Sequence, residues 1–175
     1  MQMKTWTTRI LALDIRLRKV GFAVLEGPDH LLDWGILRWR AEVDPVLATM
    51  HRISPLLALY SPSFVVLKRL NRVRKARRRK RVIDAVMREL TFRSIEVRMV
   101  KRADVRHAFR QSGSRNKYQI AASIAERFPE LRRKLPPKRK AYQPERYNAV
   151  IFDAVALAVT HRSQCEVCIS PTTGS

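Results

Sequence analysis

Short apolar runs open the chain and predict three consecutive β-strands. Residues 9–14 form a compact apolar run that ends in an acid, which is typical of a buried central strand. Residues 20–26 and 31–40 hold the next two runs, and only short polar loops separate them. Because strands joined by short loops pair antiparallel, the first forty residues predict an antiparallel meander.

After this meander the apolar residues recur at intervals of three and four. Residues 44–60 therefore predict an amphipathic helix with Pro45 in its first turn. Two further strands are expected at 64–67 and 94–100, with a helix between them that reaches residue 90. Three more helices are predicted, at about 103–111, 116–128 and 149–161.

This order of elements predicts an α/β fold. Its five-stranded mixed sheet holds an antiparallel β1-β2-β3 meander plus parallel fourth and fifth strands, and helices flank it. We expect one domain over residues 1–163 and a flexible tail at 164–175.

The net charge of the chain indicates which class of partner it binds. The chain of 175 residues has 36 Lys and Arg against 15 Asp and Glu, a formal net charge of +21. That balance argues against a metabolic enzyme for small neutral substrates and points to nucleic acid. A hydrophobic content of 46% excludes a disordered basic tail.

Cellular location follows from weaker signals. Two cysteines, no long apolar segment and a strand that begins near Arg9 favour a cytoplasmic protein without a signal peptide or membrane span. His161, Cys165 and Cys168 have the spacing of zinc ligands, although a lone pair of cysteines near a terminus is better explained as incidental free thiols.

Residues 68–81 carry ten Lys or Arg and no acid. Such a run is either a solvated helix face or a phosphate-binding surface. With basic residues further along the chain, it gives the predicted nucleic-acid-binding set. That set is Arg72, Arg74, Lys75, Arg77, Arg78, Arg79, Lys80, Arg106, Arg110, Arg115 and Lys117.

Two acids occupy positions that suggest a site. Asp14 ends the first strand, and Asp153 lies within the apolar last helix. A carboxylate among apolar residues needs a partner or must face a cleft. Each acid could instead simply pair with an Arg or Lys, and Asp153 could point outward.

The order of elements and several residues resemble the RuvC Holliday-junction resolvase family, a branch of the ribonuclease H-like fold. Asp14 resembles its first-strand catalytic aspartate, and Gly21 matches a glycine of its second strand. The matching segments are Phe64-Val65-Val66-Leu67-Lys68, Val105 to Phe109, Gly113, Asn116-Lys117, Gln119, and Asp153-Ala154-Val155-Ala156-Leu157-Ala158-Val159-Thr160-His161.

The resemblance implies DNA cleavage with two divalent ions held by four carboxylates, in recombination and repair. Here Lys68 and Val150 stand where two of those acids are expected, and Ile15-Arg16 replaces a Pro-Gly pair. We therefore expect Lys68 to lie between Asp14 and Asp153 in place of a metal. Mg²⁺ or Mn²⁺ would then be weakly bound, through Asp14 and Asp153, or absent. Glu96 or Glu145 remain alternative ligands.

Three functions stay open at this stage. The first is a RuvC-like protein that binds branched or duplex DNA through phosphates, with a degenerate nuclease centre. The second is a Mg²⁺- or Mn²⁺-dependent, structure-selective endonuclease that uses Asp14, Asp153, Lys68 and Lys117 as catalytic residues. The third is a basic RNA-associated protein without chemistry.

Two features bear on partners. The resemblance implies a homodimer, which Ile83, Val86, Met87 and Leu90 could form unless they pack on their own sheet. Tyr118, Tyr142 and Tyr147 lie among basic residues, where they could stack on unpaired bases or pack locally.

Overall fold

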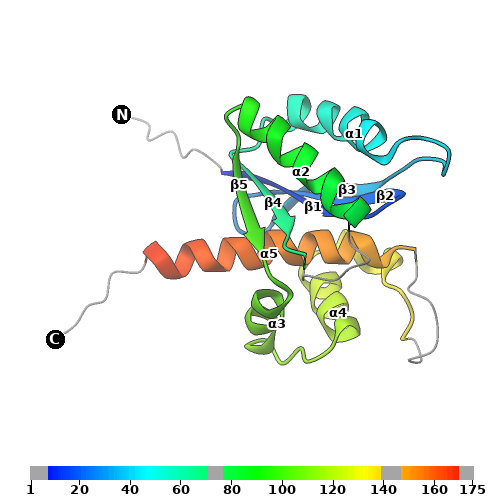
Figure 1. The fold of residues 1–175 in the computed structure, drawn as a ribbon. Helices are drawn as coiled ribbons and strands as arrows, with labels where there is room; N and C mark the ends of the chain where they lie inside the picture. The colour runs from blue at the N-terminus through cyan, green and yellow to red at the C-terminus, as the bar shows by residue number, and fades with distance from the viewer. Residues whose placement is uncertain (1–7, 71–76, 139–146, 170–175) are drawn as a thin grey trace.

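A five-stranded mixed sheet forms the centre of the computed structural model, which describes residues 8–70, 77–138 and 147–169 (Figure 1). Its strands are β1 (Arg9–Ile15), β2 (Lys19–Glu26), β3 (His30–Arg38), β4 (Phe64–Lys68) and β5 (Glu96–Val100). The strand order is β3-β2-β1-β4-β5. The first three strands pair antiparallel, and β4 and β5 run parallel to β1. The predicted fold class is confirmed.

Helices cover both faces of this sheet. They are α1 (Pro45–Tyr60), α2 (Arg77–Phe92), α3 (Arg102–Arg110), α4 (Lys117–Arg127) and α5 (Ala149–Ile169). Figure 1 shows α1 and α2 on one face and α5 on the other, with α3 and α4 beside α5. All five were predicted; the 3₁₀ helix Pro129–Lys134 was not. No helix in the described part of the chain is long and apolar enough to cross a membrane.

The alternation of side chains along β1 divides the core in two. Ile10 and Ala12 pack with α5, whereas Leu11, Leu13 and Ile15 pack with α1 and α2. Because both faces are covered, β1 from Ile10 onward is buried throughout, as its unbroken apolar run indicated. A polar residue at its end is therefore held away from water.

The apolar face of helix α2 packs inside the molecule. Ile83, Val86 and Leu90 are buried against the sheet, and Met87 is partly buried beside them. These residues could have formed a dimer or packed on their own sheet, and the structure shows the packing on the sheet. The homodimer remains a prediction that these residues do not support.

Helix α5 is longer than predicted. It continues to Ile169, so the predicted domain boundary at residue 163 falls inside the helix. Residues 170–175 lie outside the described residues. The apolar pattern weakens at Arg162, Ser163 and Gln164, before the helix ends.

Gly21 sets how closely α5 approaches the sheet. A Cβ atom at this position would lie 2.3 Å from the backbone oxygen of Val150 and 2.7 Å from its Cγ2. Only glycine allows that approach. Gly21 also pairs with Asp14 across the β1–β2 ladder. The contact therefore fixes the first turn of α5, and with it Asp153, next to the end of β1.

Replacing Gly21 with alanine should push the first turn of α5 away from β2. We expect a loss of about 1–3 kcal/mol in the free energy of unfolding, or about 3–10 °C in Tm. Thermal denaturation measures this loss. Gly35→Ala is the control, because its methyl group would meet only the Phe22 ring, the movable end of a side chain. Equal losses for both variants would contradict the assigned role of Gly21.

A second prediction concerns the contact between α1 and β3. The hydroxyl of Tyr60 donates a hydrogen bond of 2.6 Å to Oδ2 of Asp33, and this bond, with some burial, raises the pKa of Tyr60 to about 12. A raised pKa means that the stabilisation is complete below the ordinary value near 10 and is lost as the pH rises through 12. The Tm advantage of the wild type over Tyr60→Phe should therefore shrink between pH 10 and 12. An advantage that stays constant over that range would contradict the assignment.

Candidate functional site

The two acids that the sequence singled out lie side by side. Asp14 comes from the end of β1 and is fully buried. Asp153 comes from the second turn of α5, and its side chain is 15% exposed. The packing of α5 over β1 and β2 brings together residues that are 139 positions apart. Asp153 faces the centre of the molecule rather than solvent.

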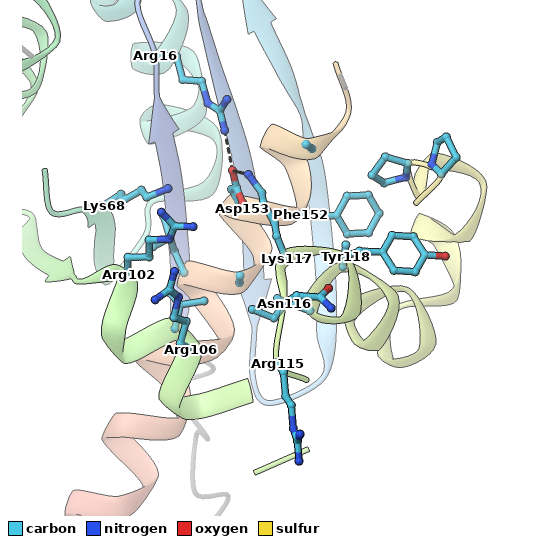
Figure 2. A pocket seen from close by; sticks show the side chains of 18 of the residues that line it. Arg16, Lys68, Arg102, Arg106, Arg115, Asn116, Lys117, Tyr118, Phe152 and Asp153 are labelled. Carbon is cyan, nitrogen blue, oxygen red and sulfur yellow. Dashed lines mark hydrogen bonds and ion pairs between the residues drawn. The ribbon is translucent and has the colours of Figure 1, made fainter. Parts of the chain in front are cut away.

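One guanidinium group joins these two carboxylates. Arg16 directs its Nη2 to Oδ2 of Asp14 at 2.9 Å and to Oδ2 of Asp153 at 2.6 Å. Its Nε also donates to Asp14 Oδ2 at 2.9 Å. Figure 2 shows the contact with Asp153 as a dashed line. Arg16 follows β1 directly, so the strand that carries one acid also supplies the cation that bridges both.

Two further cations complete the ion-pair network. Arg79, from the first turn of α2, places its Nη2 3.1 Å from Oδ1 of Asp14. Lys117, the first residue of α4, places its Nζ 2.7 Å from Oδ2 of Asp153. Each carboxylate is thus held by cations from two different elements. The sequence left open whether each acid simply pairs with an Arg or Lys, and the observed contacts match that alternative.

The prediction that Lys68 would bridge the two acids is wrong, because Arg16 takes that place. Lys68 lines the same cleft, and its charge helps to lower the pKa of Asp153. Its ammonium nevertheless forms no ion pair with any residue that the structure describes. With Arg16, Arg79 and Lys117, it makes four cations around two carboxylates. This centre is net positive when all six groups are ionised.

Burial and the paired acid act together on Asp153. Burial raises the pKa of its carboxyl group, and the neighbouring charge of Asp14 raises it further, while Lys117 and Lys68 oppose both effects. Burial also lowers the pKa of Arg79, against the attraction of Asp14. The Nε atom of Arg79 is buried and has no hydrogen-bond partner among the described residues. Among the described residues, the ion pairs therefore offset both the repulsion between Asp14 and Asp153 and the desolvation of the buried groups.

The start of α4 fixes Lys117 in position. Oδ1 of Asn116 accepts a hydrogen bond from the backbone N–H of Gln119, and Oε1 of Gln119 accepts from the N–H groups of Arg115 and Asn116. This reciprocal cap orders the first turn. The turn before it contains Gly113, whose φ of +80° favours glycine. The sequence match over Gly113, Asn116 and Gln119 thus corresponds to a defined local structure.

A cleft of about 610 Å³ opens beside these ion pairs. Figure 2 shows that its labelled side chains come from α3, α4, α5 and the ends of β1 and β4. Asp153 is the single acid among its described lining residues. The cations that line it are Arg16, Lys68, Arg79, Arg102, Arg106, Arg115 and Lys117.

The donor set of this cleft does not fit a two-metal centre. The described residues contain no group of three or more acids, histidines or cysteines placed to hold a metal ion. Both available carboxylates already bind cations, and Val150 packs against the backbone of β2. A unit cation about 5 Å from a divalent ion repels it by roughly 7 kcal/mol at an effective dielectric constant of about 20. This environment therefore disfavours Mg²⁺ or Mn²⁺.

Neither alternative acid supplies the missing ligand in the described structure. Glu96 begins β5, pairs with Arg98, and lies at the opposite end of the parallel strands from Lys68. Glu145 lies outside the described residues.

The predicted nucleic-acid-binding residues are only partly brought together. Arg106, Arg115 and Lys117 line the cleft, and Arg79 binds Asp14. Arg77, Arg78 and Arg110 are exposed, Lys80 pairs with Asp84 at 2.7 Å, and Arg72, Arg74 and Lys75 fall outside the described residues.

Sequence reasoning missed two residues. Arg16 was noted only as a departure from the resolvase pattern, and Arg102 was not singled out. The available signal for Arg16 was its position two residues after a buried acid, where a long cation can reach back to that acid. Arg102 lies one helical turn before Arg106, so the two share one face of α3.

The remaining candidate residues are the possible zinc ligands and the three tyrosines. His161 Nε2 lies 3.7 Å from Cys165 Sγ, and the side chain of Cys168 lies outside the described residues. Lys19 and Arg38 lie over the ring of Tyr147 at 5.0 and 5.3 Å. Tyr118 lines the cleft, whereas Tyr142 is outside the described residues. Of the two tyrosines of this group that the structure describes, Tyr118 is the one placed beside the site.

Comparison with known proteins identifies the fold. No family model and no curated protein matches the sequence. The structure is similar to Thermus thermophilus RuvC in complex with a Holliday junction, with a TM-score of 0.72 and 17% identity over 92% of this chain and 96% of that one. The yeast mitochondrial Holliday junction resolvase has a TM-score of 0.57 and 10% identity, over 93% and 85%. Fowlpox virus resolvase bound to Holliday junction DNA has a TM-score of 0.51 and 12% identity, over 93% and 100%.

These likenesses confirm the RuvC-like, ribonuclease H-like fold that the sequence resemblance implied. They extend over almost the whole of this chain. At such low identity they establish the architecture, while the chemistry has to be argued from the side chains of this chain.

Removing Arg16 should expose the repulsion between the two acids. We expect Arg16→Ala to lower the free energy of unfolding by about 1–3 kcal/mol, since Arg79 and Lys117 still pair with the carboxylates. Millimolar Mn²⁺ should then raise the Tm of Arg16→Ala more than that of the wild type, because the ion can take the vacated place. Differential scanning fluorimetry measures both effects.

The matched control is Arg115→Ala, which removes an exposed cation of the same cleft that pairs with neither acid. It should leave both the Tm and the Mn²⁺ response near the wild-type values. A wild-type protein that Mn²⁺ stabilises as strongly as Arg16→Ala would contradict the role given to Arg16.

Proposed function

We propose that this protein binds branched or duplex DNA through phosphate contacts and that its nuclease centre is degenerate. The observation that carries the proposal is the bridge from Arg16 to both Asp14 and Asp153. In a fold shared with Holliday-junction resolvases, this bridge occupies the two acids that a metal would need. A cleft rich in cations remains beside them.

The distribution of charge supports a polyanionic partner. The formal net charge is +21, and seven cations line one cleft beside a single described acid. Each Lys or Arg that neutralises a phosphate releases counterions and steepens the salt dependence of binding. Contacts of this kind position DNA without reading its bases, so we expect selection by shape more than by sequence.

DNA is favoured over RNA by the solved relatives alone. RuvC and the Fowlpox virus resolvase were each solved with a Holliday junction. Transferring that ligand to this chain is part of the proposal. Lys68, Arg106, Arg115 and Lys117 are the cleft residues expected to contact phosphates, with Arg77, Arg78 and Arg110 extending the surface.

A direct test compares binding and cleavage on the same substrates. Gel shifts at fixed salt with a labelled four-way junction, a duplex and a structured RNA of equal length should show the tightest binding to the junction. Incubation with Mg²⁺ or Mn²⁺ should leave the junction intact, because both carboxylates are engaged by cations. Denaturing gels measure cleavage.

Asp14→Asn provides the control for cleavage. Junction cleavage that this variant abolishes would overturn the degenerate centre and favour a working endonuclease, with Asp14 and Asp153 as ligands and Lys68 and Lys117 stabilising charge. Tighter binding to structured RNA than to the junction would favour an RNA-associated protein. Equal affinity for all three substrates would reduce the function to nonspecific binding of polyanions.

A further inference from the structure

The cleft has a cationic side and an apolar side. In Figure 2, Lys68, Arg102 and Arg106 lie on one side of the ion pairs around Asp153, and Phe152 and Tyr118 lie on the other. Neutralising the charge of a DNA backbone uses the cations and leaves the apolar side chains without a ligand. The apolar side therefore requires a separate explanation.

The cationic side has no counterion among the residues that the structure describes. Arg102 and Arg106 are one turn apart on α3, where like charges repel. Within the described ranges, neither of them nor Lys68 pairs with a carboxylate. Three cations from two elements can together bind the oxygens of one phosphate group through charge-assisted hydrogen bonds. This side of the cleft matches a single phosphate.

The apolar side contains an aromatic ring, that of Tyr118. Tyr118 is half-buried in the first turn of α4, next to the cap that orders this turn. Phe152, Ile120, Pro136 and Pro137 line the cleft with it. Rings of this kind bind unpaired bases by stacking, which tolerates any base because every base has a π-face. Paired bases inside a duplex are already stacked on both faces and cannot use such a surface.

We propose that the cleft binds one unpaired nucleotide of a DNA strand without a divalent ion. The phosphate lies on Lys68, Arg102 and Arg106, and the base stacks on Tyr118. The cleft volume of about 610 Å³ falls in the range of small-ligand sites, which suits a nucleotide unit rather than a duplex segment. The inference rests on the proposed binding of branched DNA and assigns a strand-level substrate to the same cleft.

Fluorescence anisotropy can test this inference with two labelled DNAs in EDTA at fixed salt. One is a splayed duplex with two unpaired arms, and the other is a blunt duplex with the same number of nucleotides. The wild type should bind the splayed duplex more tightly. Tyr118→Ala should lower affinity for the splayed duplex about 5- to 150-fold, the usual contribution of one stacked base, and leave the blunt duplex unchanged.

Three further variants check the geometry. Tyr118→Phe keeps the ring and should retain the preference for unpaired arms. Arg106→Gln should weaken binding of the splayed duplex and reduce its salt slope by about one phosphate. Tyr147→Ala, the matched control, removes a tyrosine outside the described cleft lining and should leave the preference unchanged.

The outcomes separate this inference from the proposed function. Junction binding in EDTA together with an unchanged preference in Tyr118→Ala would overturn the nucleotide site and leave the proposed function standing. Equal losses on both DNAs, or a preference that appears only with Mg²⁺, would overturn it as well. Failure to bind any of the DNAs would overturn the proposed function itself.

Discussion

The contact on which the site depends is the double ion pair of Arg16 with Asp14 and Asp153. Two carboxylates this close, one of them fully buried, cannot both remain charged without a cation between them. A metal ion is one solution, and a planar guanidinium group is another. Arg16 donates to both acids from a single rigid group, Arg79 binds the other carboxylate oxygen of Asp14, and Lys117 shares Oδ2 of Asp153 with Arg16. The same three cations that stabilise the fold around these acids thereby make the centre unsuited to divalent ions.

Most of the fold could be predicted from the sequence because apolar spacing reports burial directly. The continuous run in β1, the change of interval after Asp44 and the alternation in β5 each define one element. The antiparallel and parallel strand directions followed from short loops in the first half and helical crossovers in the second, whereas the order β3-β2-β1-β4-β5 comes from the structure. The end of α5 could not be predicted, because the apolar pattern weakens at Arg162 while the helix continues to Ile169.

The candidate site was predicted less completely, for a physical reason. Pattern identifies which acids are buried, and it found Asp14 and Asp153. Which cation reaches them depends on side-chain length and direction at the end of a strand, which spacing does not encode. Lys68 and Arg16 both emerge at that edge of the sheet, and the structure gives the bridge to Arg16. Arg102 and Lys68 line the same cleft through tertiary packing, which has no local sequence signal.

The tight contact between Gly21 and Val150 bears on how readily this chain could acquire metal-dependent chemistry. An acid at the end of β4 would require only the replacement of Lys68. An acid at position 150 of α5 would have to fit where a methyl group of Val150 now packs against the backbone at Gly21. Arg16 would also have to leave at the same time, since a partial set of carboxylates would face an intact set of cations. Intermediate sequences would carry uncompensated charge in the core, so stability selects against each single step. The close packing of α5 on Gly21, together with the surrounding cations, thus opposes a stepwise gain of metal ligands at this centre.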